Sequence, residues 1–178
     1  MFMSLRLRNF ALLVVFVVLA VLTSTIMWDL FNWRMLPHIL LVISVAVIGE
    51  NLVSSQGYYH YTRQETNGPF VRSVPLWIMF LWVFCVQTGF LVSLNLGLGG
   101  ISACLMSGIL ISIADLLLIE PFMSRTMELW RWTPVVNGYF RIVPSKVHRF
   151  TAPPGNYVTW FVFPILANCF LVSLMIFF

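Results

Sequence analysis

The 178-residue chain contains little charge: 9% of its residues are charged, whereas 60% are hydrophobic. A soluble domain typically carries about 25% charged residues, so this chain has too few charges to cover a water-facing surface. The same composition excludes intrinsic disorder, which requires low hydrophobicity and high net charge. With a mean hydropathy of +0.93, the chain is expected to be an integral membrane protein.

The motifs of several common site classes are also missing. Three cysteines in apolar stretches provide no disulfide framework and no zinc pattern, and we interpret them as core residues. The three histidines lack the i, i+3 or i, i+4 spacing of ligand pairs, so we expect no metal site. The sequence has no phosphate loop, nucleophile elbow or dinucleotide fingerprint. The net charge of +4 suits the basic bias of a membrane protein, and we expect no nucleic-acid partner.

Long hydrophobic runs indicate the architecture. A helix that crosses the bilayer needs about 20 apolar residues, and its backbone groups must be satisfied within the helix. The sequence therefore predicts one all-α membrane domain over residues 1–178, a polytopic bundle of about five transmembrane helices. The predicted spans are residues 10–28, 35–54, 74–94, 101–119 and 157–178, and the two aromatic and basic loops are residues 55–72 and 121–156.

The basic residues predict the orientation of these spans. If the N-terminus faces the cytoplasm, every lysine and arginine except Arg34 falls in a cytoplasmic segment. Enrichment of basic residues in cytoplasmic segments is the usual pattern of membrane proteins. We therefore expect a cell-membrane protein whose N-terminus and two main loops are cytoplasmic.

Three acidic residues lie within or at the end of hydrophobic spans: Glu50, Asp115 and Glu120. A charge at the centre of a membrane helix costs about 2.5–3.5 kcal/mol on insertion scales, so such residues face the protein interior, pair or stay protonated. In a structural interpretation they bond arginine or backbone groups and fix the helix packing. In a functional interpretation a desolvated carboxyl delivers a proton to a substrate.

The spacing of two of these carboxyls restricts the functional interpretation. Asp115 and Glu120 are five residues apart, which on an α-helix separates them by about 140° around the axis. Both line one site only if Pro121 or unwinding of the helix end turns Glu120 inward. Glu50, at another helix end on the same predicted side, would then complete a group of three carboxyls.

Aromatic side chains gather in the two loops. The candidate site residues of these regions are Tyr58, Tyr59, His60, Tyr61, Trp130, Trp132, Tyr139, Asn156 and Trp160. One interpretation is an aromatic belt at the level of the lipid headgroups. The other is the wall of a cavity for a long apolar or polyene ligand, whose rings stabilise a cationic intermediate.

Two ordered blocks of motifs carry a family resemblance. The first is IGENLVSSQGYYHY at residues 48–61, followed by GPFVRSVPLWI at residues 68–78. The second is ADLLLIEPFM at residues 114–123, followed by WRW, GYF, VP and, at residues 156–160, NYVTW. In their order and spacing, over about residues 48–162, these motifs resemble the membrane carotenoid-biosynthesis family, which includes hydratases of bisanhydrobacterioruberin and related acyclic carotenoids.

The resemblance implies a helical membrane enzyme that adds water to a terminal C=C of an acyclic polyene without a cofactor. In such chemistry an acid protonates the double bond, and water captures the resulting tertiary carbocation with the help of a base. The resemblance assigns the acidic positions to Glu50, Asp115 and Glu120, and it assigns the aromatic residues and Asn156 to the substrate site.

The chain also departs from the family, because it lacks one or two of the family's helices and has an apparent insertion before Asn156. A shortened relative suggests an alternative function as a non-catalytic subunit of a larger membrane complex that binds carotenoid, another pigment or lipid. The expected partners are therefore membrane lipid, a long hydrophobic ligand such as a polyene, and a membrane complex.

Overall fold

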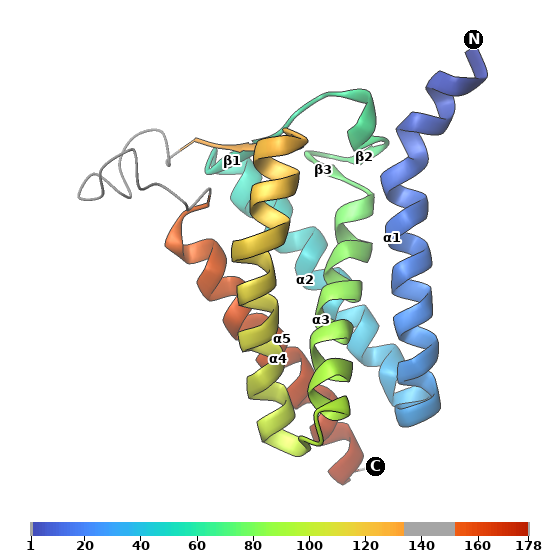
Figure 1. Ribbon diagram of the computed structural model, residues 1–178, viewed down its shortest axis with the longest axis vertical. Coiled ribbons are helices and arrows are strands. Elements are labelled where there is room, and N and C mark those ends of the chain that lie inside the picture. The colour runs from blue at the N-terminus through green and yellow to red at the C-terminus, as the bar shows by residue number, and fades with distance from the viewer. Residues whose placement is uncertain (1, 134–151, 178) are drawn as a thin grey trace.

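The computed structural model describes residues 2–133 and 152–177, and it describes side chains for residues 10–133 and 152–176. Five helices pack into a bundle in this part of the chain (Figure 1). They are α1 (Phe2–Phe31), α2 (Met35–Ser55), α3 (Trp77–Asn95), α4 (Gly100–Ala114) and α5 (Pro154–Phe177). Tyr139, one of the candidate site residues, lies outside the described residues.

Four helical segments of the described chain are long and apolar enough to cross a membrane: Phe10–Ser55, Trp77–Asn95, Gly100–Thr126 and Pro154–Ile176. The first contains 46 residues and combines α1 with α2. A short 3₁₀ turn, η1 (Asn32–Arg34), divides the two helices, and Asn32 has a φ of 53°, in the left-handed region that no helix interior adopts. The chain reverses there, so that α2 returns toward the end at which α1 begins (Figure 1). The all-α prediction and the compatibility with a membrane are confirmed.

The predicted hairpin of the third and fourth spans is present. Helix α3 ends at Asn95 and α4 begins at Gly100, and between them Gly97 has a φ of 80°. The start of α3 is three residues later than predicted, because Val74–Pro75 forms strand β3 and pairs with β2 (Phe70–Val71).

The end of the fourth predicted span was wrong. The helix does not stop at residue 119 but continues as a π-helical segment, η3 (Asp115–Thr126), so residues 121–126 of the predicted loop are helical. Pro121 lies inside this segment. Proline lacks an N–H group and interrupts the α-helical ladder, which is why the sequence indicated a helix end. The wider π turn, with its i→i+5 hydrogen bonds, allows the helix to continue past that position.

Polar side chains join the helices in the interior of the bundle. The amide of Asn168 on α5 donates to the Ser107 hydroxyl on α4 at 2.9 Å, and its oxygen lies 3.1 Å from Nε2 of His38 on α2. The Thr23 hydroxyl on α1 donates to Oε1 of Gln87 on α3 at 2.7 Å. All five side chains are buried, and such hydrogen bonds between helices stabilise helix association in lipid.

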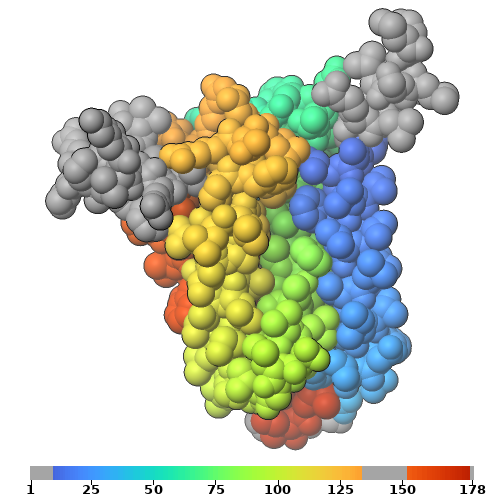
Figure 2. Space-filling model, viewed as in Figure 1, coloured from blue at the N-terminus to red at the C-terminus, as the bar shows by residue number. Residues whose placement is uncertain are grey.

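Small residues permit close packing of two helices. A Cβ atom on Gly108 of α4 would overlap the carbonyl oxygen of Phe161 on α5. Small residues at helix crossings allow backbones to approach closely, which is a common source of packing energy in membranes. On the face of the bundle that Figure 2 shows, the atoms of α1, α3 and α4 form one continuous surface.

The short strands lie together at one end of the bundle. Strand β1 (Tyr59–Tyr61) and the hairpin of β2 and β3 lie at the end where α1 begins, and β4 (Trp130–Trp132) follows η3 at the same end (Figure 1). The turn η1 and the connection between α3 and α4 lie at the opposite end (Figure 1). Both aromatic motifs are therefore placed over one end of the helices, as the sequence predicted.

Candidate functional site

Two aromatic motifs from distant parts of the chain form one antiparallel strand pair. The register joins Tyr59 with Trp132, His60 with Arg131, and Tyr61 with Trp130. Successive side chains of a strand point to opposite faces, so the aromatic residues share one face and His60 shares the other with Arg131. The aromatic face is directed into the bundle, because Tyr59, Tyr61 and Trp130 are buried, whereas His60 is exposed.

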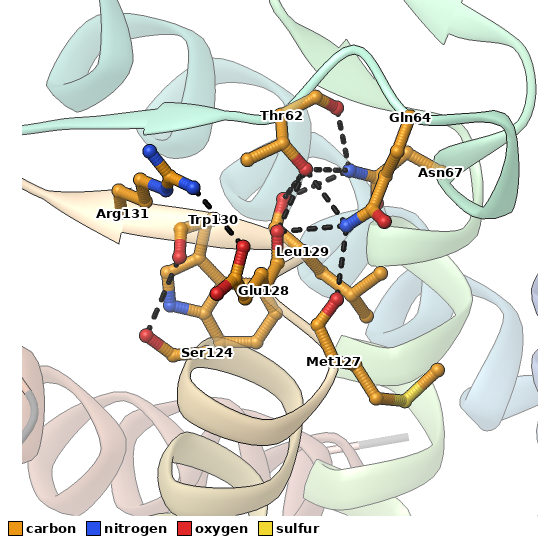
Figure 3. A network of polar contacts seen from close by, with 9 residues as sticks. All are labelled: Thr62, Gln64, Asn67, Ser124, Met127, Glu128, Leu129, Trp130 and Arg131. Atoms are coloured by element: carbon orange, nitrogen blue, oxygen red, sulfur yellow. Dashed lines mark hydrogen bonds and ion pairs between the residues drawn. The ribbon is translucent and has the colours of Figure 1, made fainter.

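Amide side chains hold this strand pair in place. Asn67, in the 3₁₀ turn η2 (Glu65–Asn67), donates to the carbonyl oxygens of Leu129 at 2.8 Å and of Thr62 at 2.7 Å. Gln64 donates to the carbonyl oxygen of Glu128 at 2.7 Å. Figure 3 shows these side chains converging on the backbone that leads into β4. The first loop thereby fixes the position of the residues that lead into β4.

The carboxyl of Glu50 comes from the last turns of α2. Its Oε2 accepts a hydrogen bond from the Tyr61 hydroxyl at 2.9 Å, and its Oε1 accepts one from Nε1 of Trp82 on α3 at 2.9 Å. The Trp82 ring in turn contacts the Trp160 ring of α5, with 4.7 Å between the centroids. Glu50 is therefore held between two helices and the strand pair.

The carboxyl of Glu120 accepts hydrogen bonds from two indoles of β4. Nε1 of Trp130 lies 3.2 Å from its Oε1, and Nε1 of Trp132 lies 3.1 Å from its Oε2. The side chain is 2% exposed. Both donors stand on the inward face of β4, so the W-x-W spacing places two N–H groups at one carboxyl.

Asp115 supplies the third carboxyl and is buried, with 1% of its surface exposed. Its Oδ2 accepts a hydrogen bond from the Asn156 amide at 2.7 Å. Asn156 lies in the first turn of α5, so this bond joins the end of α4 to the beginning of α5.

The π-helical segment η3 explains how Asp115 and Glu120 share a site. An α-helix would separate residues five apart by about 140°. In a π-helix the backbone hydrogen bonds join residues i and i+5, so residues five apart lie one above the other. Asp115 begins η3, and both carboxyls are turned toward the same cavity. The π-helical segment is thus the change of helix geometry that a shared site of Asp115 and Glu120 requires.

The three carboxyls line a cavity of about 40 Å³ below the strand pair. Besides these carboxyls, its wall contains Tyr59, Tyr61, Trp82, Trp130, Trp132, Asn156, Trp160 and the apolar residues Ile78, Leu81 and Ile119. A polar cavity that exceeds about 15 Å³ has room for water, so this chamber can hold it beside the carboxyls. We call it the carboxyl chamber.

An apolar groove adjoins the carboxyl chamber. It has a volume of about 410 Å³, and its walls include Val45 and Val53 of α2 and Thr159 of α5. The groove and the chamber share five residues, which are Glu50, Tyr59, Trp82, Trp132 and Asn156. A long apolar molecule in this α2–α5 groove would therefore have one end at the carboxyls.

The ionisable side chains that line the chamber in the described part of the chain are three carboxyls and two tyrosines. No Lys, Arg or His is among the described residues that line it. Burial raises the pKa of the Tyr61 phenol well above its usual range, and the charge of Glu50, the hydrogen bond to that carboxyl and the charge of Glu120 raise it further. Tyr61 thus remains a neutral hydrogen-bond donor to Glu50. Acids and aromatic rings are thus combined among the described residues of the chamber, and the faces of such rings attract cations.

The structure brings most of the sequence-predicted site residues together. Glu50, Asp115, Glu120, Tyr59, Tyr61, Trp130, Trp132, Asn156 and Trp160 all line the carboxyl chamber. Tyr58 is 42% exposed and lines the α2–α5 groove instead. His60 lies on the outer face of β1 and lines neither space. Within the described residues, no group of three His, Cys, Asp or Glu side chains is placed to hold a metal ion.

Trp82 is a site residue that its local sequence did not indicate. This residue hydrogen-bonds Glu50, contacts Trp160 and lines both the chamber and the groove. A signal was available, because a buried indole N–H within an apolar span needs an acceptor, and buried carboxyls are suitable partners. Glu50 and Trp82 are far apart in the sequence, so no local pattern indicates their hydrogen bond.

Comparison of the chain with known protein families, with curated proteins and with solved structures finds no match. The fold and the site define an all-α protein whose described residues form four helical segments long and apolar enough to cross a membrane. Three of its carboxyls line a chamber beneath an aromatic strand pair.

Proposed function

We propose that this protein is an integral-membrane hydratase that adds water across a terminal C=C of an acyclic polyene of the carotenoid type. The observation that carries the proposal is the continuity of an apolar groove with a chamber that contains three carboxyls and aromatic rings. The resemblance of the motifs to the membrane carotenoid-biosynthesis family supports the same chemistry.

In the proposed topology the five helices each cross the membrane, and the N-terminus and both aromatic loops face the cytoplasm. Described basic residues at the loop end, including Arg63, Arg72 and Arg125, support this orientation, because basic residues favour the cytoplasmic side. Arg34 lies in the turn at the opposite end.

The substrate enters from the bilayer through the α2–α5 groove. Its terminal unit reaches the carboxyl chamber past Trp82, while the rest of the polyene remains in the groove and in the surrounding lipid. The groove is lined mainly by apolar surface, so the hydrocarbon does not have to pass through water.

Asp115 is the proposed acid. Asn156 donates to Oδ2, and Oδ1 makes no hydrogen bond with the described residues, so a proton on Oδ1 is directed to the chamber. The electron pair of the terminal C=C takes this proton and forms a C–H bond at the chain carbon. The branched carbon becomes a tertiary carbocation, and Asp115 becomes a carboxylate.

The rings and Glu120 stabilise the carbocation. Trp82 and Trp160, whose ring centroids are 4.7 Å apart, both line the chamber, and cations are attracted to the faces of such rings. The two indole donors hold Glu120 as an acceptor, because a carboxylate accepts hydrogen bonds at both oxygens.

Glu50 is the proposed base. It removes one proton from the water that attacks the carbocation, and the oxygen of that water forms the new C–O bond of a tertiary alcohol. Transfer of the proton from Glu50 to Asp115 restores the starting state. The balance is one water added per double bond, without an external oxidant or reductant.

Expression in a host that makes lycopene tests the proposal. We expect a tertiary alcohol one water heavier than the pigment, and loss of this product in the variants Asp115→Asn and Glu50→Gln. Glu128→Gln is the matched control, because this exposed carboxyl pairs with Arg131 outside the chamber. Unchanged pigment from several acyclic polyenes, with folded protein in the membrane, would contradict the hydratase function.

An alternative function as a non-catalytic membrane subunit has its own structural support. A second groove of about 420 Å³ lies on the outer surface between α1, α2 and α3, and it is lined by apolar residues such as Val21, Trp28 and Phe80. This surface could contact a partner helix. Native mass measurement after gentle extraction separates the functions, because a chain that migrates alone and without pigment would contradict the subunit function.

A further inference from the structure

A third groove lies on an exposed side of α2, where the hairpin of β2 and β3 meets the helix. It has a volume of about 700 Å³. Its apolar wall contains Val47, Ile48 and Leu52 of α2. Its polar groups are Asn51 of α2 and, on the hairpin at the loop end, Arg72 and Ser73, beside the apolar Val71. We call it the hairpin groove, and it shares no residue with the carboxyl chamber or the α2–α5 groove.

The hairpin is fixed on α2 by one side chain. Oδ1 of Asn51 accepts hydrogen bonds from the Ser73 hydroxyl at 3.0 Å and from the Ser73 backbone N–H at 3.3 Å. The Asn51 amide donates to the carbonyl oxygen of Val47 at 2.8 Å. The hydrogen bonds of Asn51 are thus used within the protein, which holds the hairpin turn and the neighbouring Arg72 against the groove.

Arg72 has an unusual backbone conformation, and its charge has no partner among the residues that the structure describes. Its φ is 58°, in the left-handed region that non-glycine residues adopt at a cost of about 1–2 kcal/mol. Its guanidinium makes no hydrogen bond or ion pair with the described residues, and Arg72 is the only charged residue among the described residues that line the groove. By contrast, Arg63 on the same loop stacks over the Phe70 ring at 4.3 Å.

The distribution of polarity matches one class of ligand. Ile48 is 67% exposed and Leu52 is 55% exposed, so both side chains face the hydrocarbon when α2 lies in a membrane. Arg72 lies at the loop end, where the helix meets the headgroup region. A guanidinium binds phosphate through paired N–H donors, and the apolar wall below it can contact an acyl chain.

We propose that the hairpin groove binds an anionic phospholipid, with its phosphate on Arg72 and an acyl chain along Ile48 and Leu52. The proposal rests on insertion of the helices into a membrane and is independent of the hydratase function. In the proposed orientation the site faces the cytoplasmic leaflet, which is the anionic leaflet of cell membranes.

The bound lipid would also join two parts of the carboxyl chamber. Asn51, at the groove, directly follows Glu50 on α2, and the hairpin leads into α3, which carries Trp82. A lipid that bridges α2 and the hairpin therefore reinforces the position of the Glu50–Trp82 hydrogen bond. Phospholipid binding is expected to raise the midpoint temperature of unfolding.

Native mass spectrometry of the full-length protein from mixed micelles tests the site. The probes are phosphatidylglycerol and phosphatidylcholine with identical acyl chains, and inorganic phosphate as a headgroup without chains. We expect preferential retention of phosphatidylglycerol and a loss of affinity of about fivefold in Arg72→Gln, as one basic residue near an anionic surface supplies. Arg72→Lys should keep part of the preference, because it keeps the charge but not the paired donors.

Arg63→Gln is the matched control, since it removes one positive charge from the same loop outside the groove. It should retain phosphatidylglycerol as the wild type does, and far-UV circular dichroism should show that each variant is folded. Equal retention of both lipids, equal losses in Arg72→Gln and Arg63→Gln, or retention of inorganic phosphate alone would overturn the proposal. Failure of the hydratase assay would not affect it.

Discussion

Replacement of Trp82 by phenylalanine tests whether the indole N–H holds Glu50 in the chamber. The change removes the hydrogen bond of 2.9 Å to Oε1 of Glu50 and keeps an aromatic ring near Trp160. A hydrogen bond to a charged group contributes about 1.5–3 kcal/mol to the free energy of unfolding, and one to a neutral group contributes about 1 kcal/mol. The smaller volume of phenylalanine adds a cost for the space that remains.

Trp77 provides a matched control for the lost volume. It is 1% exposed, compared with 6% for Trp82, and both lie on α3. Its indole N–H is buried and has no hydrogen-bond partner among the described residues. Trp77→Phe therefore removes a similar volume without removing a hydrogen bond, and it also removes an unsatisfied donor that costs about 1–3 kcal/mol. We expect Trp82→Phe to lower the free energy of unfolding by at least about 1.5 kcal/mol more than Trp77→Phe.

The measurement is unfolding of the purified protein by SDS in mixed micelles, followed by far-UV circular dichroism. A double-mutant cycle with Glu50→Leu isolates the pair, because leucine removes the acceptor and suits an apolar helix. The extra cost of Trp82→Phe should disappear in the Glu50→Leu background. Equal costs of the two tryptophan changes, or an undiminished cost of Trp82→Phe beside Leu, would refute the role of this hydrogen bond.

Three further predictions concern packing, ionisation and chemistry. Gly108→Ala should lower the free energy of unfolding by about 1–3 kcal/mol, because its Cβ overlaps the α5 backbone, whereas Gly49→Ala, with open space around it, should not destabilise. The folded-state pKa of Tyr61 is raised above about 10, so the stability that its neutral phenol contributes is complete below pH 10 and falls at higher pH. The difference in free energy of unfolding between wild type and Tyr61→Phe should therefore shrink above pH 10. A difference that stays constant with pH would contradict this. Asn156→Ala should lower kcat of hydration, because Asp115 loses its hydrogen bond of 2.7 Å, and an unchanged kcat would remove Asn156 from the mechanism.

The helices were predictable from local properties of the sequence. The runs without charge are long enough to cross a bilayer, and the glycine cluster near Gly97 marks the turn between α3 and α4. The continuation of the helix past Pro121 was not predictable by the same reasoning. Proline normally ends an α-helix, and the π-helical alternative depends on packing that no local pattern records.

The candidate site was predictable in its residues but only partly in its geometry. Acids in apolar spans are rare, so Glu50, Asp115 and Glu120 stood out without any structure. Their convergence required the π turn, which places residues five apart on one face. His60 was included because of its neighbours in sequence, but strand alternation turns it outward, and this became visible only from the pairing of β1 with β4.

The sequence by itself determined the all-α class and the compatibility with a membrane, because long runs without charge suit the bilayer better than water. It also determined which residues are chemically exceptional, since a carboxyl in an apolar helix is costly unless it is paired or protonated. The tertiary structure decided which groups meet: Trp82 with Glu50, both indoles of β4 with Glu120, and Asn156 with Asp115. Hydrogen bonds act over about 3 Å, so these pairings depend on how helices far apart in the chain pack against one another.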